Sequence, residues 1–307
     1  MEEGAGMKET EISFVIPAYN EGGAIKTTIK SVLDLCSGQE WGRGAEVIVV
    51  DDGSTDKTAD EAAEAGARVV RHPQNMGYGR ALKSGIAAAT HDTIVICDAD
   101  NTYPLDAIPD LLNLYNKGYD MVVGARTGKH YEESFLKKRL RSVLRFLVEY
   151  ASGRVIEDIN SGLRVFSKKS AMPYFPRLCD TFSFTTSLTL AYTMTAKSVG
   201  YLPIDYHQRH GKSKVRLLRD ALRTLQFITE AIMYYNPLKL FILFSVVLVC
   251  LSLAGFLSSL LFHLFTGYIL GIGSLLLSIL MFGLGLLSVL LKQIMHSFDQ
   301  TRTTKNY

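Results

Sequence analysis

The sequence predicts an α/β domain with a mostly parallel sheet, followed by two helices that cross a membrane. Short apolar runs alternate with helical stretches in the N-terminal part of the chain, which is typical of a parallel sheet covered by helices. From Leu240 to Leu291 the chain contains no Asp, Glu, Lys or Arg. Because one membrane-crossing helix needs about 20 apolar residues, this stretch has room for two.

Five strands and four helices are expected in the α/β domain. The strands are Ile12–Ile16, Glu46–Val50, Arg68–Arg71, Thr93–Cys97 and Asp120–Val123. The helices between them are Gly22–Leu35, Thr55–Ala65, Tyr78–Ala89 and Leu105–Asn116. In open sheets of this kind, ligands bind beyond the carboxyl ends of the strands. Polar residues that follow the strands are therefore the candidates for a functional site.

The C-terminal stretch is interpreted as a hairpin of two spans, Leu240–Phe262 and Ile269–Leu291. The alternative is a pair of buried core helices, but helices this long and apolar on every face do not suit so small a domain. Lys239 precedes the first span and Lys292 follows the second, whereas the connecting loop has no basic residue. By the positive-inside rule, the N-terminal domain and both termini are expected in the cytosol. The N-terminus lacks the apolar segment of an export signal, which agrees with this orientation.

Two basic amphipathic helices are expected beside the membrane. The first has apolar residues at helical spacing from Leu136 to Val148, and its basic residues are Lys137, Lys138, Arg139, Arg141 and Arg145. The second runs from Val215 to Tyr235 and leads into the first span. Such helices can lie in the headgroup region, where each Lys or Arg adds about 1 kcal/mol of attraction to anionic lipids. The alternative for the first helix is that its apolar stripe faces the domain core and its charges are solvated.

Two acidic motifs follow strands of the predicted sheet. Asp98-Ala99-Asp100 places two carboxylates on the same side of an extended segment, and paired oxygen ligands suit Mg²⁺ or Mn²⁺. Asp51–Asp56 can form a turn and a helix cap. Two adjacent carboxylates at a strand end also match the hydrogen-bond donors of a nucleotide base or ribose.

These motifs resemble the signatures of family 2 glycosyltransferases, which have the GT-A fold. The matching segments are Val15–Glu21, Asp51–Asp56 and Asp98–Asp100, and their order and spacing agree with the family. Asn160–Arg164 and Arg209–Lys214 are similar to motifs of the branch that contains dolichol-phosphate mannose and polyprenyl-phosphate glucose synthases. Paired C-terminal spans also occur in that branch.

The resemblance implies roles for individual residues. Donor contacts fall on Pro17, Tyr19, Glu21, Asp52, Asp98 and Ser213. Asp98 and Asp100 would hold the metal together with Thr102, which stands where mannosyl members commonly carry a metal-binding Gln. The expected catalytic residues are Asp98, Asp100, Arg209 and Lys214.

Basic residues are the candidates for binding the phosphate of the acceptor. They are Arg126, Arg139, Arg164, Arg209 and Lys214. Guanidinium groups present paired donors that match phosphate oxygens. For Arg139 the alternative is a solvated surface charge.

The resemblance implies inverting, metal-dependent transfer of a single sugar from a nucleotide sugar to polyprenyl or dolichyl phosphate at the cytosolic membrane face. A UDP-sugar is preferred because of Thr102, and GDP-mannose is the alternative donor. A non-catalytic, membrane-tethered binding subunit would predict loss of the acidic motifs, which are intact. A polysaccharide synthase would carry a Gln-x-x-Arg-Trp motif, but the only tryptophan is Trp41. A redox enzyme is disfavoured because Gly77-Tyr78-Gly79 lacks the third glycine of the dinucleotide fingerprint.

The expected organisation has five parts. They are a flexible N-terminus (1–10), a GT-A catalytic domain (11–214), a juxtamembrane amphipathic helix (215–237), two transmembrane helices (238–292) and a cytosolic tail (293–307). The four cysteines have no metal-binding spacing and are expected to be reduced packing residues. The formal net charge of +3 does not indicate a nucleic-acid partner, and a homo-oligomer is compatible with the sequence.

Overall fold

The computed structural model describes residues 11–127, 135–206 and 217–304. The chain forms two compact units. The first contains Met1–Glu149 and Arg154–Ile228, and the second contains Tyr150–Gly153 and Thr229–Tyr307. The second unit therefore begins within the predicted juxtamembrane helix.

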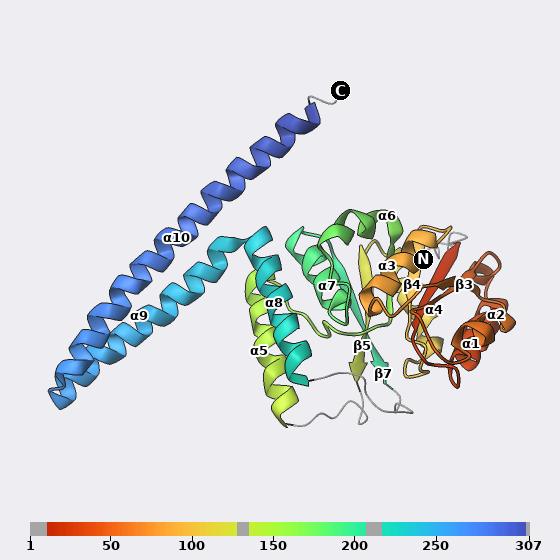
Figure 1. Cartoon of the computed structure of the whole chain (residues 1–307), viewed down its shortest axis with the longest axis horizontal. Helices are drawn as coiled ribbons and strands as arrows, with labels where there is room; N and C mark the ends of the chain where they lie inside the picture. The colour runs from red at the N-terminus through yellow and green to blue at the C-terminus, as the bar shows by residue number, and fades with distance from the viewer. Residues whose placement is uncertain (1–10, 128–134, 207–216, 305–307) are drawn as a thin grey trace, which may run out of the picture. The chain divides into compact units, whose positions relative to one another are not determined.

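Within the described residues, the first unit contains one sheet of seven strands in the order β3-β2-β1-β4-β6-β5-β7 (Figure 1). The strands are β1 (Ile12–Ala18), β2 (Glu46–Asp51), β3 (Arg68–Arg71), β4 (Thr93–Ile96), β5 (Met121–Thr127), β6 (Arg164–Ser167) and β7 (Val199–Asp205). Only β6, among these strands, runs antiparallel to its neighbours β4 and β5. The predicted mostly parallel sheet is confirmed, and the five predicted strands are β1 to β5.

β6 and β7 are absent from the prediction, and their residues explain why. β7 lies at the edge of the sheet and contains Gly200 and Pro203, which weaken a strand pattern. β6 is only four residues long and starts with the charged residue Arg164. Its position is fixed by pairing with β4 and β5, which lie far from it in the sequence.

Helices accompany the sheet (Figure 1), and the first four along the chain correspond to the helices predicted between the strands. They are α1 (Ile25–Ser37), α2 (Thr58–Glu64), α3 (Tyr78–Ala88), α4 (Ile108–Asn116), α5 (Phe135–Ser152), α6 (Lys168–Ala171), α7 (Phe184–Met194) and α8 (Leu217–Tyr235). Short 3-10 turns occupy Glu40–Gly42, Leu105–Ala107 and Met172–Arg177. α7 is buried along most of its length and contains no charged residue, so the pattern of apolar and charged positions that reveals surface helices is missing from it.

The core lies where the central strands meet these helices. Every residue of β1 and β4 is buried, as expected for strands of a parallel sheet covered on both faces. α3 approaches β1 very closely, because a Cβ on Gly85 would lie 2.4 Å from Cγ1 of Val15. This packing fixes the first turn of α3 near the carboxyl ends of the strands.

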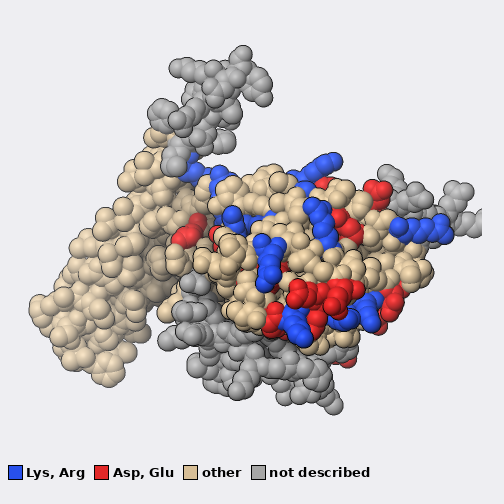
Figure 2. Space-filling view, turned by 45° about the vertical axis from the view of Figure 1, so that its right-hand side comes forward, with Lys and Arg blue, Asp and Glu red and all other residues tan. Residues whose placement is uncertain are grey.

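The second unit contains the antiparallel helices α9 (Pro237–Phe262) and α10 (Phe265–Thr304) (Figure 1). In the described part of the chain, these two helices are long and apolar enough to cross a membrane, with mean hydropathies of 2.8 and 2.5. Many of their large side chains are exposed, such as Leu260 at 72 %. Figure 2 shows their surface with very few charged side chains, whereas Lys, Arg, Asp and Glu are spread over the first unit. The hairpin interpretation is supported over buried core helices.

Small residues hold the hairpin together. A Cβ on Gly255 would lie 2.8 Å from the backbone nitrogen of Gly271, and Ser252 donates a hydrogen bond to the Gly271 carbonyl at 2.7 Å. His263 adopts a left-handed backbone with φ 51° where the chain reverses, at the predicted break. α10 continues to Thr304, so the first part of the predicted tail is helical.

Candidate active site

The two acidic motifs lie at the same edge of the sheet. Asp51 is the last residue of β2, and Asp98 follows the end of β4. β2, β1 and β4 are neighbouring parallel strands, so their carboxyl ends meet at one edge, where open α/β sheets bind ligands.

Asp98 is held by residues from two other segments. The hydroxyl of Tyr78 donates a hydrogen bond of 2.9 Å to Oδ1 of Asp98. Burial and the neighbouring carboxylate raise the pKa of Tyr78, so its hydroxyl stays protonated as the donor. A Cβ on Gly162 would lie 2.8 Å from Oδ2 of Asp98, so the carboxylate occupies the space of a missing side chain. The backbone N–H of Gly162 donates to the Tyr103 hydroxyl at 2.6 Å, which fixes this close approach.

Asp100 is 9 % exposed and is oriented by Thr102. The Thr102 hydroxyl donates a hydrogen bond of 2.6 Å to Oδ1 of Asp100. Asn101 between them has a left-handed backbone with φ 56°, and its side-chain oxygen accepts a hydrogen bond from Thr28 on α1 at 2.7 Å. Thr102 itself is fully buried, and its side chain also forms a hydrogen bond with Tyr206.

The loop after β1 is interlocked with the loop after β2. The backbone N–H groups of Asn20 and Glu21 donate to the hydroxyls of Ser54 and Thr58, each at 2.9 Å. Gly22 donates to Asp56 at 3.1 Å. These bonds fasten the segment before α1, which starts at Ile25, to the loop after β2.

The interlocking brings together the predicted donor-binding residues of the Val15–Glu21 segment. Pro17 is buried in β1, and Tyr19 and Glu21 are half-buried beside the Asp51–Asp56 motif. The structure thus places these residues at the edge that carries both acidic motifs.

Asp52 is 3 % exposed, and both of its carboxylate oxygens are bound by the chain itself. Oδ1 lies 2.7 Å from Nδ1 of His72 and accepts the N–H of Met76 at 2.9 Å. Oδ2 accepts the N–H of Gly77 at 2.9 Å. This arrangement differs from the predicted contact of Asp52 with a base or ribose, because the carboxylate fixes the turn before α3.

Arg126 lies at the carboxyl end of β5 and forms a buried ion pair with Asp158. Its Nε and Nη2 atoms donate to the two oxygens of Asp158 at 2.7 and 2.9 Å, and its guanidinium lies 5.6 Å from the ring centre of Tyr206. Burial acts to raise the pKa of Asp158, but the hydrogen bonds and charge of Arg126 outweigh it and lower the pKa below its ordinary value. Asp158 is absent from the predicted set because its isolated position in the sequence gives no signal.

The prediction that Arg164 binds an acceptor phosphate is corrected by its surroundings. Arg164 is fully buried and donates to the carbonyls of Ser161 and Ile159, each at 2.8 Å, and to the Thr189 hydroxyl at 2.6 Å. Its guanidinium therefore ties the loop before β6 to α7 and does not face a phosphate site.

The remaining predicted residues are Arg139 and three residues of the Arg209–Lys214 motif. Arg139 is exposed on α5. Arg209, Ser213 and Lys214 lie outside the described residues. Among the residues that the structure describes, no group of three or more His, Cys, Asp or Glu side chains could hold a metal. All four cysteines lie in the described part of the chain and are free; Cys36, Cys97 and Cys179 are buried, as expected for packing residues, whereas Cys250 is exposed.

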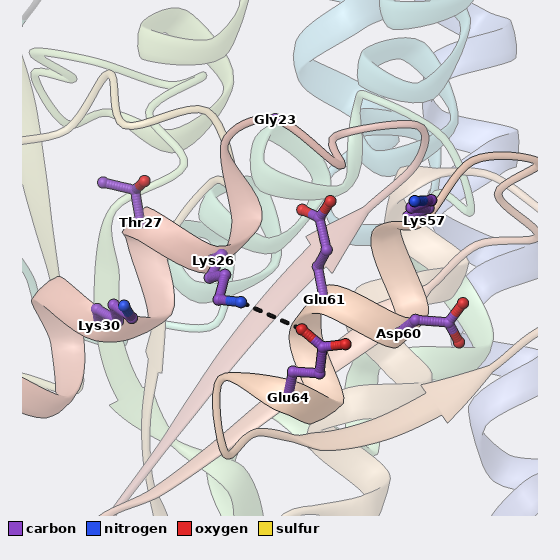
Figure 3. A pocket seen from close by; sticks show the side chains of 8 residues that line it. All are labelled: Gly23, Lys26, Thr27, Lys30, Lys57, Asp60, Glu61 and Glu64. Atoms are coloured by element: carbon purple, nitrogen blue, oxygen red, sulfur yellow. Dashed lines mark hydrogen bonds and ion pairs between the residues drawn. The ribbon is translucent and has the colours of Figure 1, made fainter.

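A hollow of about 430 Å³ lies between α1 and α2, next to the end of the Asp51–Asp56 motif (Figure 3). Its lining residues are Gly23, Lys26, Thr27, Lys30, Lys57, Asp60, Glu61 and Glu64. Three lysines face three carboxylates, and Lys26 pairs with Glu64 at 3.1 Å. Because these charges are balanced and solvated, the hollow does not resemble a site for a charged donor.

The fold and the paired acidic loops define a glycosyltransferase with a GT-A-like fold. A model of the glycosyl transferase family 2 matches residues 13–175, which is more than half of the chain. The chain belongs to this family.

Curated relatives extend the similarity beyond the family model. A dolichyl-phosphate hexose transferase of Haloferax volcanii is 29 % identical over 207 residues, which cover 67 % of this chain and 86 % of that protein. An undecaprenyl-phosphate 4-deoxy-4-formamido-L-arabinose transferase of Edwardsiella ictaluri is 27 % identical over 250 residues, which cover 79 % of this chain and 74 % of that protein.

Solved structures share the fold. The glucosyl-3-phosphoglycerate synthase of Mycobacterium tuberculosis, in complex with UDP, is 23 % identical and superposes with a TM-score of 0.59 over 73 % of this chain and 80 % of that one. The same enzyme crystallised with Mn²⁺, UDP-glucose and glycerol 3-phosphate gives a TM-score of 0.55 at 24 % identity, over 72 % of this chain and 80 % of that one.

Proposed function

We propose that the chain transfers a single sugar from a nucleotide sugar to polyprenyl or dolichyl phosphate at the cytosolic face of a membrane. The observation that carries the proposal is the Asp98 and Asp100 pair at the carboxyl end of the sheet, each held by its own hydroxyl donor, Tyr78 and Thr102. The names of the two curated relatives describe transfer to dolichyl and undecaprenyl phosphate, which supports this acceptor class.

A divalent cation suits the chemistry of this pair. Carboxylates are the ligands that Mg²⁺ and Mn²⁺ prefer, and a related fold has been crystallised with Mn²⁺ and UDP-glucose. Asp98 and Asp100 would hold the ion, and Thr102 would orient Asp100. When bound, the cation supplies positive charge that stabilises the departing nucleoside diphosphate.

The transfer needs positioning more than proton removal. A phosphate monoester has its second pKa near 6, so the acceptor is largely a dianion at neutral pH. One of its oxygens attacks the anomeric carbon in line as the bond from that carbon to the donor diphosphate breaks, and the sugar is transferred with inversion. The chain's part is to hold the two substrates in that geometry, and no strong base is required.

Basic residues would hold the acceptor phosphate beside the donor. Arg126 lies at the same edge of the sheet as the acidic motifs, since β5 runs in the same direction as β4. Arg139, on α5, and Arg209 and Lys214, outside the described residues, complete the proposed set. Arg164 is excluded from it by its buried hydrogen bonds.

The donor would sit on the interlocked loops. Pro17, Tyr19 and Glu21 would surround the base and ribose, with Ser213 contributing from outside the described residues. Asp52 would act indirectly, through the turn that it fixes. We favour a UDP-sugar because Thr102 replaces the Gln of mannosyl members, and GDP-mannose is the alternative.

The apolar hairpin would cross the membrane with both termini in the cytosol, because basic residues flank it on both sides. α5 and α8 would lie at the lipid surface. Val143 and Phe146 of α5 are 56 % and 54 % exposed, and Leu222 of α8 is 59 % exposed. Apolar side chains beside basic ones are the pattern of interfacial helices.

The decisive experiment incubates the purified full-length protein with polyprenyl phosphate, Mg²⁺ or Mn²⁺, and a panel of UDP- and GDP-sugars. We expect a glycolipid with one of the donors. If no donor yields product, the proposed activity is wrong, and nucleotide binding without product would favour the non-catalytic subunit.

A matched pair of variants tests the acidic motif. Asp100→Asn should abolish product while the protein stays in the membrane fraction. Asp110→Asn makes the same chemical change at an exposed position on α4 and should retain activity. Persistent activity of Asp100→Asn would remove this residue from the proposed metal site.

A further inference from the structure

Tyr78 contacts one acidic motif, and the two residues before it contact the other. Its hydroxyl donates to Oδ1 of Asp98 at 2.9 Å. The N–H groups of the two preceding residues, Met76 and Gly77, donate to the buried carboxylate of Asp52. One short segment therefore connects the carboxylate after β2 with the carboxylate after β4.

The glycines on either side of Tyr78 are required by close backbone packing. Gly77 has φ 106°, and a Cβ there would lie 2.5 Å from the carbonyl oxygen of Asp180. A Cβ on Gly79 would lie 2.2 Å from the carbonyl oxygen of Cys179. The first turn of α3 thus presses against residues 179–180, and Tyr78 is the side chain that projects from this packed turn.

The segment that contains Cys179 and Asp180 is fastened to α3 by hydrogen bonds. Lys83 donates to the Leu178 carbonyl and to Oδ1 of Asp180, each at 2.6 Å. The N–H of Arg80 donates to the Asp180 carbonyl at 3.0 Å. This fastening sets the position of the next aromatic residue along the segment, Phe182.

Phe182 stacks on the ring of Tyr78, with centroids 5.6 Å apart and planes 12° from parallel. Phe182 is 48 % exposed, so it covers Tyr78 from the solvent side. Offset-stacked aromatic pairs restrict ring motion and add to stability beyond their buried area. The ring of Tyr78 is therefore held in one orientation, with its hydroxyl directed at Asp98.

We propose that Tyr78 is a positioning residue that orients the Asp98 carboxylate for a divalent cation, and that Phe182 holds Tyr78 in place. The inference rests on the proposed metal-dependent transfer. A donor fixed on one carboxylate oxygen limits rotation of the group and leaves its other oxygen in a defined direction. Outer partners of this kind commonly change metal affinity by 10- to 100-fold when they are removed.

The test measures Mn²⁺ binding directly, by isothermal titration calorimetry of the purified full-length protein with UDP or GDP present. Tyr78→Phe removes only the hydroxyl and should weaken Mn²⁺ binding by about 10- to 100-fold. Binding of the nucleotide without metal should be unchanged. Tyr174→Phe is the matched control, because it removes a hydroxyl that bonds to Thr195 away from the site, and its Mn²⁺ affinity should equal that of the wild type.

The outcomes separate this inference from the proposed function. If the wild-type protein binds no Mn²⁺ with either nucleotide, the metal part of the proposed function fails and the inference fails with it. If the wild type binds Mn²⁺ and Tyr78→Phe binds it equally well, the positioning role alone is wrong. Equal losses in Tyr78→Phe and Tyr174→Phe would also overturn it.

A second variant keeps the test decisive if Tyr78→Phe does not fold. Phe182→Leu keeps the Tyr78 hydroxyl but removes the stacked ring at a half-exposed position. We expect weaker Mn²⁺ binding than in the wild type with nucleotide binding in the absence of metal unchanged. Wild-type Mn²⁺ affinity in Phe182→Leu would contradict the role assigned to the stack.

Discussion

Nδ1 of His72 lies 2.7 Å from Oδ1 of Asp52, while Nε2 of the same ring lies 2.9 Å from the hydroxyl of Ser84 on α3. His72 follows β3 and Asp52 follows β2. The imidazole therefore links the ends of two strands to the helix whose first turn carries Tyr78. Asp52 and His72 are both buried, at 3 % and 8 % exposure, so this link is shielded from water.

Replacing His72 should loosen the turn before α3. His72→Ala removes one donor from a buried carboxylate, and the expected loss in the free energy of unfolding is about 2 kcal/mol. Ser84→Ala removes only the outer hydrogen bond and should cost about 1 kcal/mol. Urea unfolding followed by circular dichroism measures both. Equal stability of His72→Ala and the wild type would show that the Asp52 carboxylate does not depend on this ring.

The Arg126 and Asp158 pair should contribute to stability as well as to any acceptor binding. Arg126→Met leaves the buried Asp158 carboxylate without its partner, which costs about 3 to 5 kcal/mol in unfolding free energy. The double variant Arg126→Met with Asp158→Asn removes the uncompensated charge and should recover much of that loss. Urea unfolding measures both variants. If Arg126→Met is as stable as the wild type, the ion pair has no structural role.

The same ion pair predicts a dependence of stability on pH. The pKa of Asp158 is lowered in the folded protein from its ordinary value of 3.8, so the folded state favours the ionised group. This contribution is fully present above the ordinary value and is lost as the pH falls through the lower folded pKa. The difference in unfolding free energy between the wild type and Asp158→Asn should therefore shrink below about pH 4. A difference that grows on acidification would contradict the sign of this shift.

The hairpin should depend on glycine at one position and not at another. Gly255→Val places atoms against the backbone of α10, where even a Cβ would lie 2.8 Å from the Gly271 nitrogen, and should cost about 1 to 3 kcal/mol. Gly273→Val makes the same change at a position with no heavy atom within 4 Å of the new Cβ. Thermal unfolding of both variants in detergent should show a lower midpoint for Gly255→Val alone. Similar midpoints would show that the close helix contact is unimportant.

Local sequence patterns were sufficient for the elements that depend on short stretches of chain. The alternation of apolar strands and helices predicts β1 to β5, because buried strands are continuous apolar runs. The uncharged stretch predicts α9 and α10, because each helix is apolar on all faces. The Asp98 and Asp100 motif is recognisable because both carboxylates belong to one turn after a strand.

Tertiary structure decided what the individual polar groups do. Arg164 and Arg126 both look like phosphate ligands in the sequence, yet Arg164 is enclosed by α7 and the loop before β6, whereas Arg126 pairs with Asp158 at the carboxyl end of β5. Asp52 likewise meets partners 20 to 25 residues away along the chain. These roles depend on which distant segments pack against a side chain, and the spacing of neighbouring residues in the sequence does not predict those contacts.

The paired carboxylates after β4, the parallel sheet and the apolar hairpin were determined by the sequence alone, because each arises from the character of a continuous segment. The antiparallel β6, the burial of Arg164 and the contact of Tyr78 with Asp98 were decided only by the folded chain. Each of these three requires contact between segments that lie tens of residues apart in the sequence. The free energy of such contacts comes from packing between segments, and no single segment contains it.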